Sequence, residues 1–291
     1  MTQLRPDDLR GLATLLGSPE PNRVVPPCWH WVLLLDPVNP ASLDEDGYTI
    51  GSPITPKPGM TRMFAGGRVR TTAPLALNRE TTRTTEVASV TDRQGRRGPL
   101  HFVTMRSTWA QDGQDCLVDE QEYVFLPIQS SDPSPAGAGQ TDGDGFLATE
   151  PLLVTFSALT ANPYRIHWDR DFCRRNGHDG LVVHGPLQAL LMAQAFPCET
   201  FVGKEFSYRF RASVTAPTRL TVGIEDGEAP RPSPRRYGHR DGNPRGVLTQ
   251  APRSDFLGRN PMRQGANSVR QSLDDLSSWQ GHQISTTDDE L

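Results

Sequence analysis

An asparagine, a histidine and the start of an apolar helix lie close together in the second half of the chain. The segment Phe156–Asp169 contains Asn162 and His167, and His184 and Gly185 follow it just before an apolar run. An imidazole can accept and donate a proton near neutral pH. The amide of Asn162 does not titrate in this range, but it can orient a water molecule. The N–H of Gly185, at a helix N-terminus, can stabilise charge developing on a carbonyl oxygen. This pattern predicts proton transfer next to a carbonyl group.

Each of these residues also has a purely structural interpretation. His167 could be a loop or core histidine that is hydrogen-bonded for packing. Asn162 begins an Asn-Pro pair, which is a common turn signal. Gly185 begins a Gly-Pro pair, and such a pair is an ordinary way to start a helix. We interpret His184 as a residue beside the substrate that shapes the loop by a hydrogen bond rather than as a catalyst.

Other polar residues near this segment are candidates for substrate binding, and none indicates a metal site. Tyr164 and Arg165 precede His167 directly and are candidate substrate-binding residues. Arg209 and Arg211 are candidates of the same kind, and for each arginine a solvated surface position is the alternative. The seven histidines show no H-x-x-x-H pair and no carboxylate spacing typical of a metal site, so no metal and no cofactor are expected.

The first half is predicted to form one short helix followed by an antiparallel meander. Leucines at helical spacing after Pro6 predict a helix over residues 6–17. Runs rich in β-branched and aromatic residues, separated by glycine-containing turns, predict strands at residues 62–72, 82–92, 99–109 and 117–126. Residues 130–145 have linker composition, with repeated Ser, Pro, Gly and Asp. These patterns predict a compact α+β unit and then a domain boundary.

The second half repeats this plan in a shorter form. We expect a strand at residues 152–156, a helix at 185–196 that ends before Pro197, and strands at 206–214 and 220–224. Beyond residue 227 the chain is rich in Arg, Pro, Ser and Gly, with isolated apolar residues, so residues 228–291 are expected to be a disordered tail. The predicted domains are 1–129, a linker at 130–146, 147–227, and the tail.

Composition excludes several classes of protein. Apolar residues make up 35% of the chain and the net charge is −4, so there is no basic surface for nucleic acid. No apolar run approaches the length of a membrane span, and the N-terminus lacks the apolar region of a secretory signal. The four cysteines form no C-x-x-C pair. We therefore expect a cytoplasmic location, with a mitochondrial or peroxisomal one left open.

The two halves together resemble a double hot-dog protein, in which a sheet wraps one central helix per repeat. The second half is similar to the MaoC-like (R)-specific hydratase/dehydratase family at Phe156–Thr160, Asn162, Ile166–Asp169 and Val183–Gly185. The first half resembles the non-catalytic repeat of the mesaconyl-CoA hydratase and type 2 hydroxyacyl-thioester dehydratase branch at Trp29–Trp31, Arg62–Gly67, Gly98–Val103 and Asp119–Gln121. The wider family usually has Asp at the position of Asn162. The second repeat is expected to be incomplete, because the terminal strands have no clear counterpart after Ile224.

The resemblance implies a cofactor-free hydro-lyase acting on an acyl-CoA or acyl-carrier thioester, with mesaconyl- or itaconyl-CoA as fitting substrates. In that reading His167 is the acid and base, Asn162 positions water and Gly185 stabilises the thioester oxygen. One alternative is a 3-hydroxyacyl-thioester dehydratase of fatty-acid or polyketide synthesis. Another is an inactive protein that binds acyl thioesters. A homodimer is the expected assembly.

Overall fold

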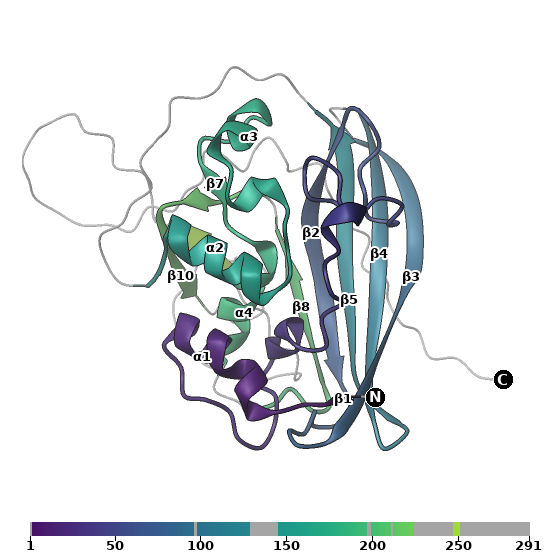
Figure 1. Ribbon diagram of the computed structural model, residues 1–291, viewed down its shortest axis with the longest axis vertical. Coiled ribbons are helices and arrows are strands. Elements are labelled where there is room, and N and C mark those ends of the chain that lie inside the picture. The colour runs from purple at the N-terminus through teal and green to yellow at the C-terminus, as the bar shows by residue number, and fades with distance from the viewer. Residues whose placement is uncertain are drawn as a thin grey trace, which may run out of the picture. The chain divides into compact units, whose positions relative to one another are not determined.

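A curved antiparallel sheet of six strands forms the larger part of the first half (Figure 1). The computed structural model describes residues 2–95, 98–128, 145–196, 199–210, 212–223 and 247–250. The strands are β1 (Thr2–Gln3), β2 (Met60–Thr71), β3 (Glu80–Gly95), β4 (Gly98–Gln111), β5 (Gln114–Pro127) and β8 (Lys204–Arg209), in the order β1-β3-β4-β5-β2-β8. The four strands predicted in the first half are confirmed, each slightly longer than expected.

The hairpins of this sheet follow from its turn residues. Asp112 and Gly113 join β4 to β5 with φ angles of 51° and 77°. Two residues with positive φ are typical of a type I′ turn, which suits the twist of an antiparallel hairpin.

On β2, a Cβ atom at Gly67 would lie 2.3 Å from the carbonyl oxygen of Glu120 and 2.5 Å from the hydroxyl of Tyr208. Glycine at this position therefore permits the close approach of the neighbouring strands.

One strand of the second half, β8, joins the first sheet by pairing with β2. The rest of the second half has a small sheet of β6 (Phe146–Ala148), β10 (Thr218–Gly223) and β11 (Val247–Gln250), in the order β11-β10-β6. A second ladder pairs β7 (Leu181–Val182) with β9 (Thr215–Ala216). The strand predicted at residues 206–214 is shorter than expected, because β8 ends at Arg209. The strand predicted at residues 220–224 corresponds to β10.

Within the predicted tail, residues 228–291, the structure describes one strand, β11, which pairs antiparallel with β10. Val247, Leu248 and Thr249 form a short β-prone run inside a segment rich in Arg and Pro. The other residues of the predicted tail, and residues 130–144 of the predicted linker, lie outside the described residues.

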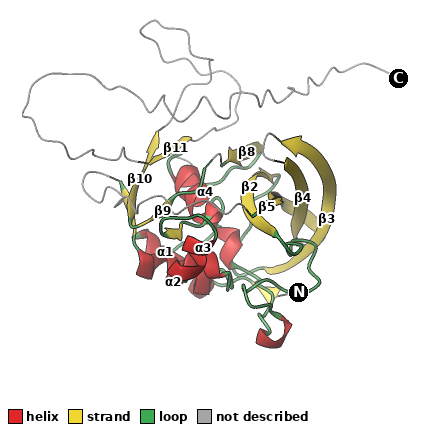
Figure 2. Ribbon diagram, turned by 90° about the horizontal axis from the view of Figure 1, so that it is seen from above, coloured by secondary structure: helices red, strands yellow, loops and turns green. Residues whose placement is uncertain are grey.

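Four α-helices lie on one side of the curved sheet (Figure 2). They are α1 (Arg10–Leu16), α2 (Glu150–Leu159), α3 (Arg170–Arg175) and α4 (Gly185–Gln194). The strand predicted at residues 152–156 was wrong, because these residues lie in α2. The Thr149 side chain caps that helix by accepting a hydrogen bond from the N–H of Leu152 at 3.3 Å. A short apolar run does not distinguish a strand from a buried helix. The capping residue Thr149 indicates a helix at this position.

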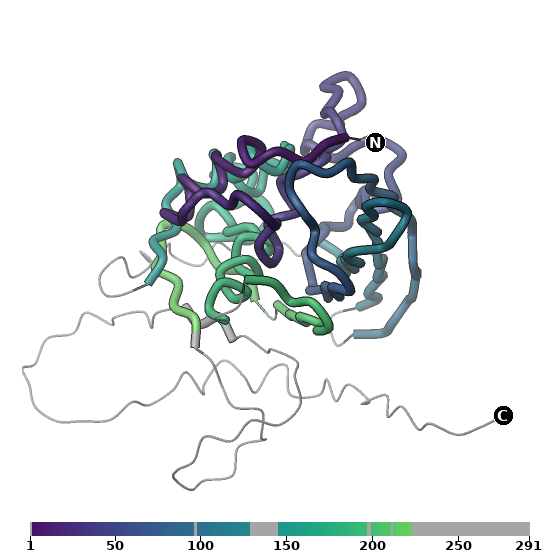
Figure 3. Tube along the Cα trace, turned by 90° about the horizontal axis from the view of Figure 1, so that it is seen from below, coloured from purple at the N-terminus to yellow at the C-terminus, as the bar shows by residue number. Residues whose placement is uncertain are grey.

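The core is built around α4, in which seven consecutive residues from Leu187 to Ala193 are buried. The predicted helix over residues 6–17 forms as a 3-10 turn at Pro6–Leu9 followed by α1, which packs on α2 (Figure 3). A second 3-10 turn, Trp29–Val32, brings two buried tryptophans under the first sheet.

In the described part of the chain, no helix is long and apolar enough to cross a membrane.

Candidate active site

A cavity of about 430 Å³ lies between the first sheet and the helices of the second half. Asn162, His167 and Gly185 line it from the second half, and Arg62 and Asp119 line it from the first. The structure therefore brings together the three residues for which the sequence predicts catalytic roles. It also adds a wall from the first repeat, which the sequence did not identify as part of the site.

His167 is fixed in a defined tautomer. It ends the 3-10 turn Arg165–His167, is buried, and has its Nδ1 atom 2.7 Å from the carbonyl oxygen of Val182 on β7. A carbonyl can only accept, so Nδ1 carries the proton and Nε2 is left as the acceptor of the neutral ring. Burial lowers the pKa of His167 from 6.5 to about 4; the bond to Val182 opposes this and the positive charge of Arg62 adds to it. The ring is thus a neutral base at physiological pH.

His184 holds the ring of His167 in place. The two imidazoles are stacked, with 3.5 Å between their centroids and 16° between their planes. On the other side, His184 Nε2 lies 2.8 Å from the hydroxyl of Ser157, which projects from α2. The pKa of His184 is lowered well below its ordinary value by burial and then by the neighbouring charge when His167 is protonated. His184 is therefore placed to orient the base, in keeping with the loop-shaping role predicted from the sequence.

Asn162 follows α2 in a tight turn. Its N–H donates to the carbonyl of Ser157 at 2.8 Å, and its Oδ1 accepts from the N–H of Tyr164 at 3.2 Å. This second bond fixes which way the amide points, because a backbone N–H can only donate. The Nδ2 group has no partner among the described residues, and Asn162 lines the cavity. Asn162 is both a turn residue and a free donor, so the two interpretations from the sequence are compatible.

Gly185 starts α4 directly after His184 and contacts the first sheet. A Cβ atom at this position would lie only 2.3 Å from Cδ1 of Phe64 on β2. The N–H of Gly185 has no hydrogen-bond partner among the described residues. The next residue, Pro186, has no backbone N–H. The N-terminus of a buried helix therefore meets the cavity with a free donor and the positive end of the helix dipole.

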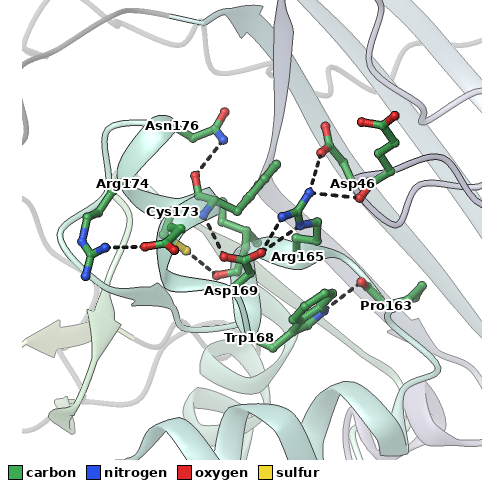
Figure 4. Close-up of polar contacts among 12 residues, drawn as sticks. Asp46, Pro163, Arg165, Trp168, Asp169, Cys173, Arg174 and Asn176 are labelled. Atoms are coloured by element: carbon green, nitrogen blue, oxygen red, sulfur yellow. Dashed lines mark hydrogen bonds and ion pairs between the residues drawn. The ribbon is translucent and has the colours of Figure 1, made fainter.

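Arg165 is not among the residues that line the cavity, and Figure 4 shows its guanidinium between Asp169 and the loop that carries Asp46. Its Nε and Nη2 atoms donate to Oδ2 of Asp169 at 3.0 and 2.6 Å, and its Nη1 donates to the carbonyl of Glu45 at 3.3 Å. The carboxylate of Asp46 lies 3.8 Å away. Arg165 braces the loop that carries His167, and a contact of this guanidinium with CoA stays a prediction. Arg209 is also paired, with Glu122 at 3.4 Å.

Tyr164 and Arg62 form a second part of the site, and only the first of them was singled out from the sequence for binding. The Tyr164 ring lies 5.9 Å from the ring of His167, measured between centroids, and 4.3 Å from the ring of Tyr48. The guanidinium carbon of Arg62 lies over the rings of Tyr48, Tyr123 and Tyr164, at 4.6, 5.2 and 5.4 Å from their centroids. Arg62 was noted only as part of a motif, because no local pattern relates it to His167.

The wall from the first repeat contains a buried polar cluster around Asp119. Oδ2 of Asp119 accepts from Nε1 of Trp31 at 2.7 Å and from Nε2 of Gln121 at 2.9 Å. His30 Nε2 lies 3.4 Å from the same oxygen. Oδ1 of Asp119 and both ring nitrogens of His30 are buried without a hydrogen-bond partner in the described part of the chain. Buried groups of this kind need a polar ligand or water, so the wall does not suit an alkyl chain.

Taken together, the site offers a neutral base, a free amide donor and a free helix N-terminus around one cavity. This combination suits proton transfer at a carbon next to a carbonyl, with the carbonyl oxygen stabilised by the N-terminus of α4.

Comparison with known proteins agrees with this chemistry. The family model of hydroxyacyl-thioester dehydratase type 2 matches residues 28–216. The chain is 37% identical over 216 residues to mesaconyl-C(4)-CoA hydratase of Chloroflexus aurantiacus, an alignment that covers 70% of this chain and 76% of the relative.

Solved structures support the fold. The chain is similar to HtdX of Mycobacterium tuberculosis with a TM-score of 0.55 and 16% identity, covering 78% of this chain and 86% of that one. A MaoC-like dehydratase from Phytophthora capsici gives a TM-score of 0.53 and 13% identity, covering 77% and 83%. The double hot-dog fold predicted from the sequence is confirmed. The chain therefore belongs to the hydroxyacyl-thioester dehydratase type 2 family, and it is a hydro-lyase.

Proposed function

We propose that the enzyme reversibly adds water across the double bond of a short α,β-unsaturated acyl-CoA thioester of the mesaconyl-C(4)-CoA type. The observation that carries the proposal is the neutral ring of His167, held by Val182 beside Asn162 and the N-terminus of α4. The name of the Chloroflexus relative supports the substrate class. In this proposal residues 147–227 carry the catalytic groups, and residues 1–129 form the opposite cavity wall.

The reaction needs one base that becomes an acid. Asn162 holds a water molecule through Nδ2, and Nε2 of His167 takes one of its protons. The water oxygen bonds to C3 of the acyl group, and the electron pair of the C2–C3 double bond moves through C2 and C1 onto the thioester oxygen. The N–H of Gly185 and the dipole of α4 stabilise that oxygen. The imidazolium then returns its proton to C2, and the thioester carbonyl re-forms.

This sequence of steps places both new bonds on one face of the substrate, because the same imidazole removes and returns the proton. General acid–base catalysis by a positioned side chain contributes roughly 10²- to 10⁴-fold. An oxyanion donor contributes about 2.7–4 kcal/mol to the barrier. A pKa below the ordinary value makes His167 a weaker base, and it makes the imidazolium a stronger acid towards C2.

The polar inner wall favours a short acyl group over a long fatty chain. A chain that reached His30 and Asp119 would leave their unpartnered atoms without water. Each such group costs about 1–3 kcal/mol when it is desolvated without a hydrogen bond. We therefore expect the catalytic efficiency to fall as the acyl chain is lengthened, opposite to the preference of a fatty-acid dehydratase.

The test is a hydration assay on the purified full-length chain. Mesaconyl-C(4)-CoA and crotonyl-CoA are supplied, the ultraviolet absorbance of the conjugated thioester is followed, and the products are checked for the gain of one water by mass. Loss of the absorbance with formation of the hydrated product supports the proposal. Tight binding of both thioesters by the folded protein without turnover would instead indicate an inactive acyl-thioester-binding protein.

A further inference from the structure

The guanidinium of Arg62 lies in a cage of three tyrosine rings inside the cavity. Tyr48 belongs to the loop before β2, Tyr123 to β5, and Tyr164 to the segment that carries His167. Among the described residues, the Arg62 side chain makes one hydrogen bond, from Nη1 to the carbonyl of Ile54 at 3.0 Å. The faces of aromatic rings attract a cation and fix its plane. The cage therefore orients Arg62 without using its other N–H donors.

Arg62 differs in this from the other arginines around the site. Arg165 is paired with Asp169, Arg209 with Glu122, and Arg83, which also lines the cavity, with Asp36. In the described part of the chain no carboxylate forms an ion pair with Arg62. An arginine presents five donors in a planar fork that matches a carboxylate. Arg62 is thus a charged, oriented and unpaired donor facing a cavity.

Arg62 lies close to the catalytic imidazole of His167. Arg62 and His167 contact the same ring, that of Tyr164, and the charge of Arg62 is felt at the imidazole. In mesaconyl-C(4)-CoA the carbon that receives water also carries the free carboxylate, one bond away. A substrate placed with this carbon beside the water on Asn162 therefore has its carboxylate close to the catalytic imidazole, where Arg62 lies.

The neighbouring phenols suit an anion as well. Burial is the main cause that raises the pKa of both Tyr48 and Tyr164, so both remain protonated at neutral pH. The cage therefore adds no negative charge that would repel a carboxylate.

We propose that Arg62 binds the free carboxylate of a dicarboxylic acyl thioester and so selects substrates in which this carboxylate is attached to the carbon that takes up water. The inference rests on the proposed function and adds to it the residue that reads the acyl group. Because the arginine comes from β2, the first repeat then supplies substrate specificity to a reaction carried out by the second.

The experiment compares two substrates that differ only in the charged group. In 3-methylcrotonyl-CoA a methyl replaces the carboxylate of mesaconyl-C(4)-CoA. Truncating one partner of a close charge pair costs about 2 kcal/mol or more, which is a factor of about 30. We expect Arg62→Gln to lower kcat/KM for mesaconyl-C(4)-CoA by about 30-fold or more, and to change kcat/KM for 3-methylcrotonyl-CoA by less than about threefold. Any effect of the lost charge on His167 acts on both substrates and cancels in the ratio.

Two variants serve as matched controls. Arg62→Lys keeps the charge but loses the fork, so it should retain part of the preference for the charged substrate. Arg83→Gln removes a paired cavity arginine and should leave the ratio of the two kcat/KM values unchanged. Equal losses on both substrates in Arg62→Gln, or an unchanged ratio, would overturn the proposal.

A binding measurement on the unaltered enzyme separates this proposal from the proposed function. Succinyl-CoA and butyryl-CoA have no double bond to hydrate, and they differ by a carboxylate in place of a methyl at the same carbon. We expect the wild-type protein to bind succinyl-CoA at least about tenfold more tightly, and Arg62→Gln to lose this difference. Equal affinities in the wild type would contradict the role of Arg62 whether or not hydration is observed. Absence of turnover together with the expected binding difference would refute only the hydratase proposal.

Discussion

The imidazole rings of His167 and His184 stack face to face, with 3.5 Å between their centroids. Each ring is held at its edge by a different element, His167 by the carbonyl of Val182 and His184 by the hydroxyl of Ser157. Burial is the main cause that lowers the pKa of both, so the pair is neutral at pH 7. In the proposed mechanism His167 is the base, and the ring of His184 fixes the plane of its imidazole.

Removing the supporting ring should impair catalysis without removing the base. In His184→Ala the ring of His167 loses its stacking partner and the buried Ser157 hydroxyl loses its hydrogen bond. A displacement of about 1 Å at a reacting group can cost roughly 10²-fold, so we expect kcat to fall by about 10- to 100-fold with little change in KM. His184→Phe keeps an aromatic ring and should retain more activity than His184→Ala. Equal activities of the two variants would argue against an orienting stack. The measurement is steady-state hydration kinetics.

The acidic limb of the pH–rate profile should report the lowered pKa of His167. Its pKa is about 4, against an ordinary value of 6.5. The neutral base is therefore present throughout the range from pH 8 to pH 5, and kcat/KM should be flat there. The loss of activity should be centred near pH 4. Initial rates measured after brief exposure to each pH separate this effect from unfolding, and a midpoint between pH 6 and 7 would be inconsistent with a buried His167 as the base.

The same pKa shift predicts how stability depends on pH. Between about pH 4 and 6.5 the unfolded chain binds a proton at His167 that the folded chain does not, so the free energy of unfolding rises with pH in this window. The stability is fully present above pH 6.5 and is lost as the pH falls towards 4. The lowered pKa of His184 acts in the same direction. His167 alone should contribute about 3 kcal/mol to the difference. Urea unfolding at pH 5 and pH 7 should show a smaller difference in His167→Gln than in the wild type.

Gly185→Ala should distort the start of α4. The added Cβ atom would meet Cδ1 of Phe64 at 2.3 Å, and overpacking of this kind costs about 1–3 kcal/mol. We expect a lower melting temperature and a lower kcat. Because alanine keeps the backbone N–H, the double variant Gly185→Ala/Phe64→Leu should recover both stability and activity. Recovery of stability without any recovery of activity would mean that the position of Phe64 itself matters for the reaction.

Much of this architecture could be predicted from the sequence. The β-branched runs at residues 62–72, 82–92, 99–109 and 117–126 gave the main strands, and the apolar run ending before Pro197 gave α4. Asn162, His167 and Gly185 line one cavity together with Tyr164 and His184, whereas Arg165 does not line it. Their roles remain predictions.

Other features could not be predicted, because they depend on contacts between distant segments. The pairing of β8 with β2 joins residues of the two halves, and no local pattern encodes it. The run Leu152–Phe156 has an apolar content that fits a strand or a helix, and it lies in α2, which Thr149 caps and which packs on α1. Arg165 and Arg62 look alike in the sequence, but only the structure distinguishes a paired arginine from an unpaired one.

The central claim is that His167 is the acid and base of the reaction, and the most direct test is kcat/KM of His167→Gln for mesaconyl-C(4)-CoA. The control is His178→Gln, which changes a histidine that does not line the cavity. We predict a loss of roughly 10²- to 10⁴-fold for His167→Gln with a native circular dichroism spectrum, and near wild-type activity for His178→Gln. Wild-type activity in a folded His167→Gln enzyme would contradict the account.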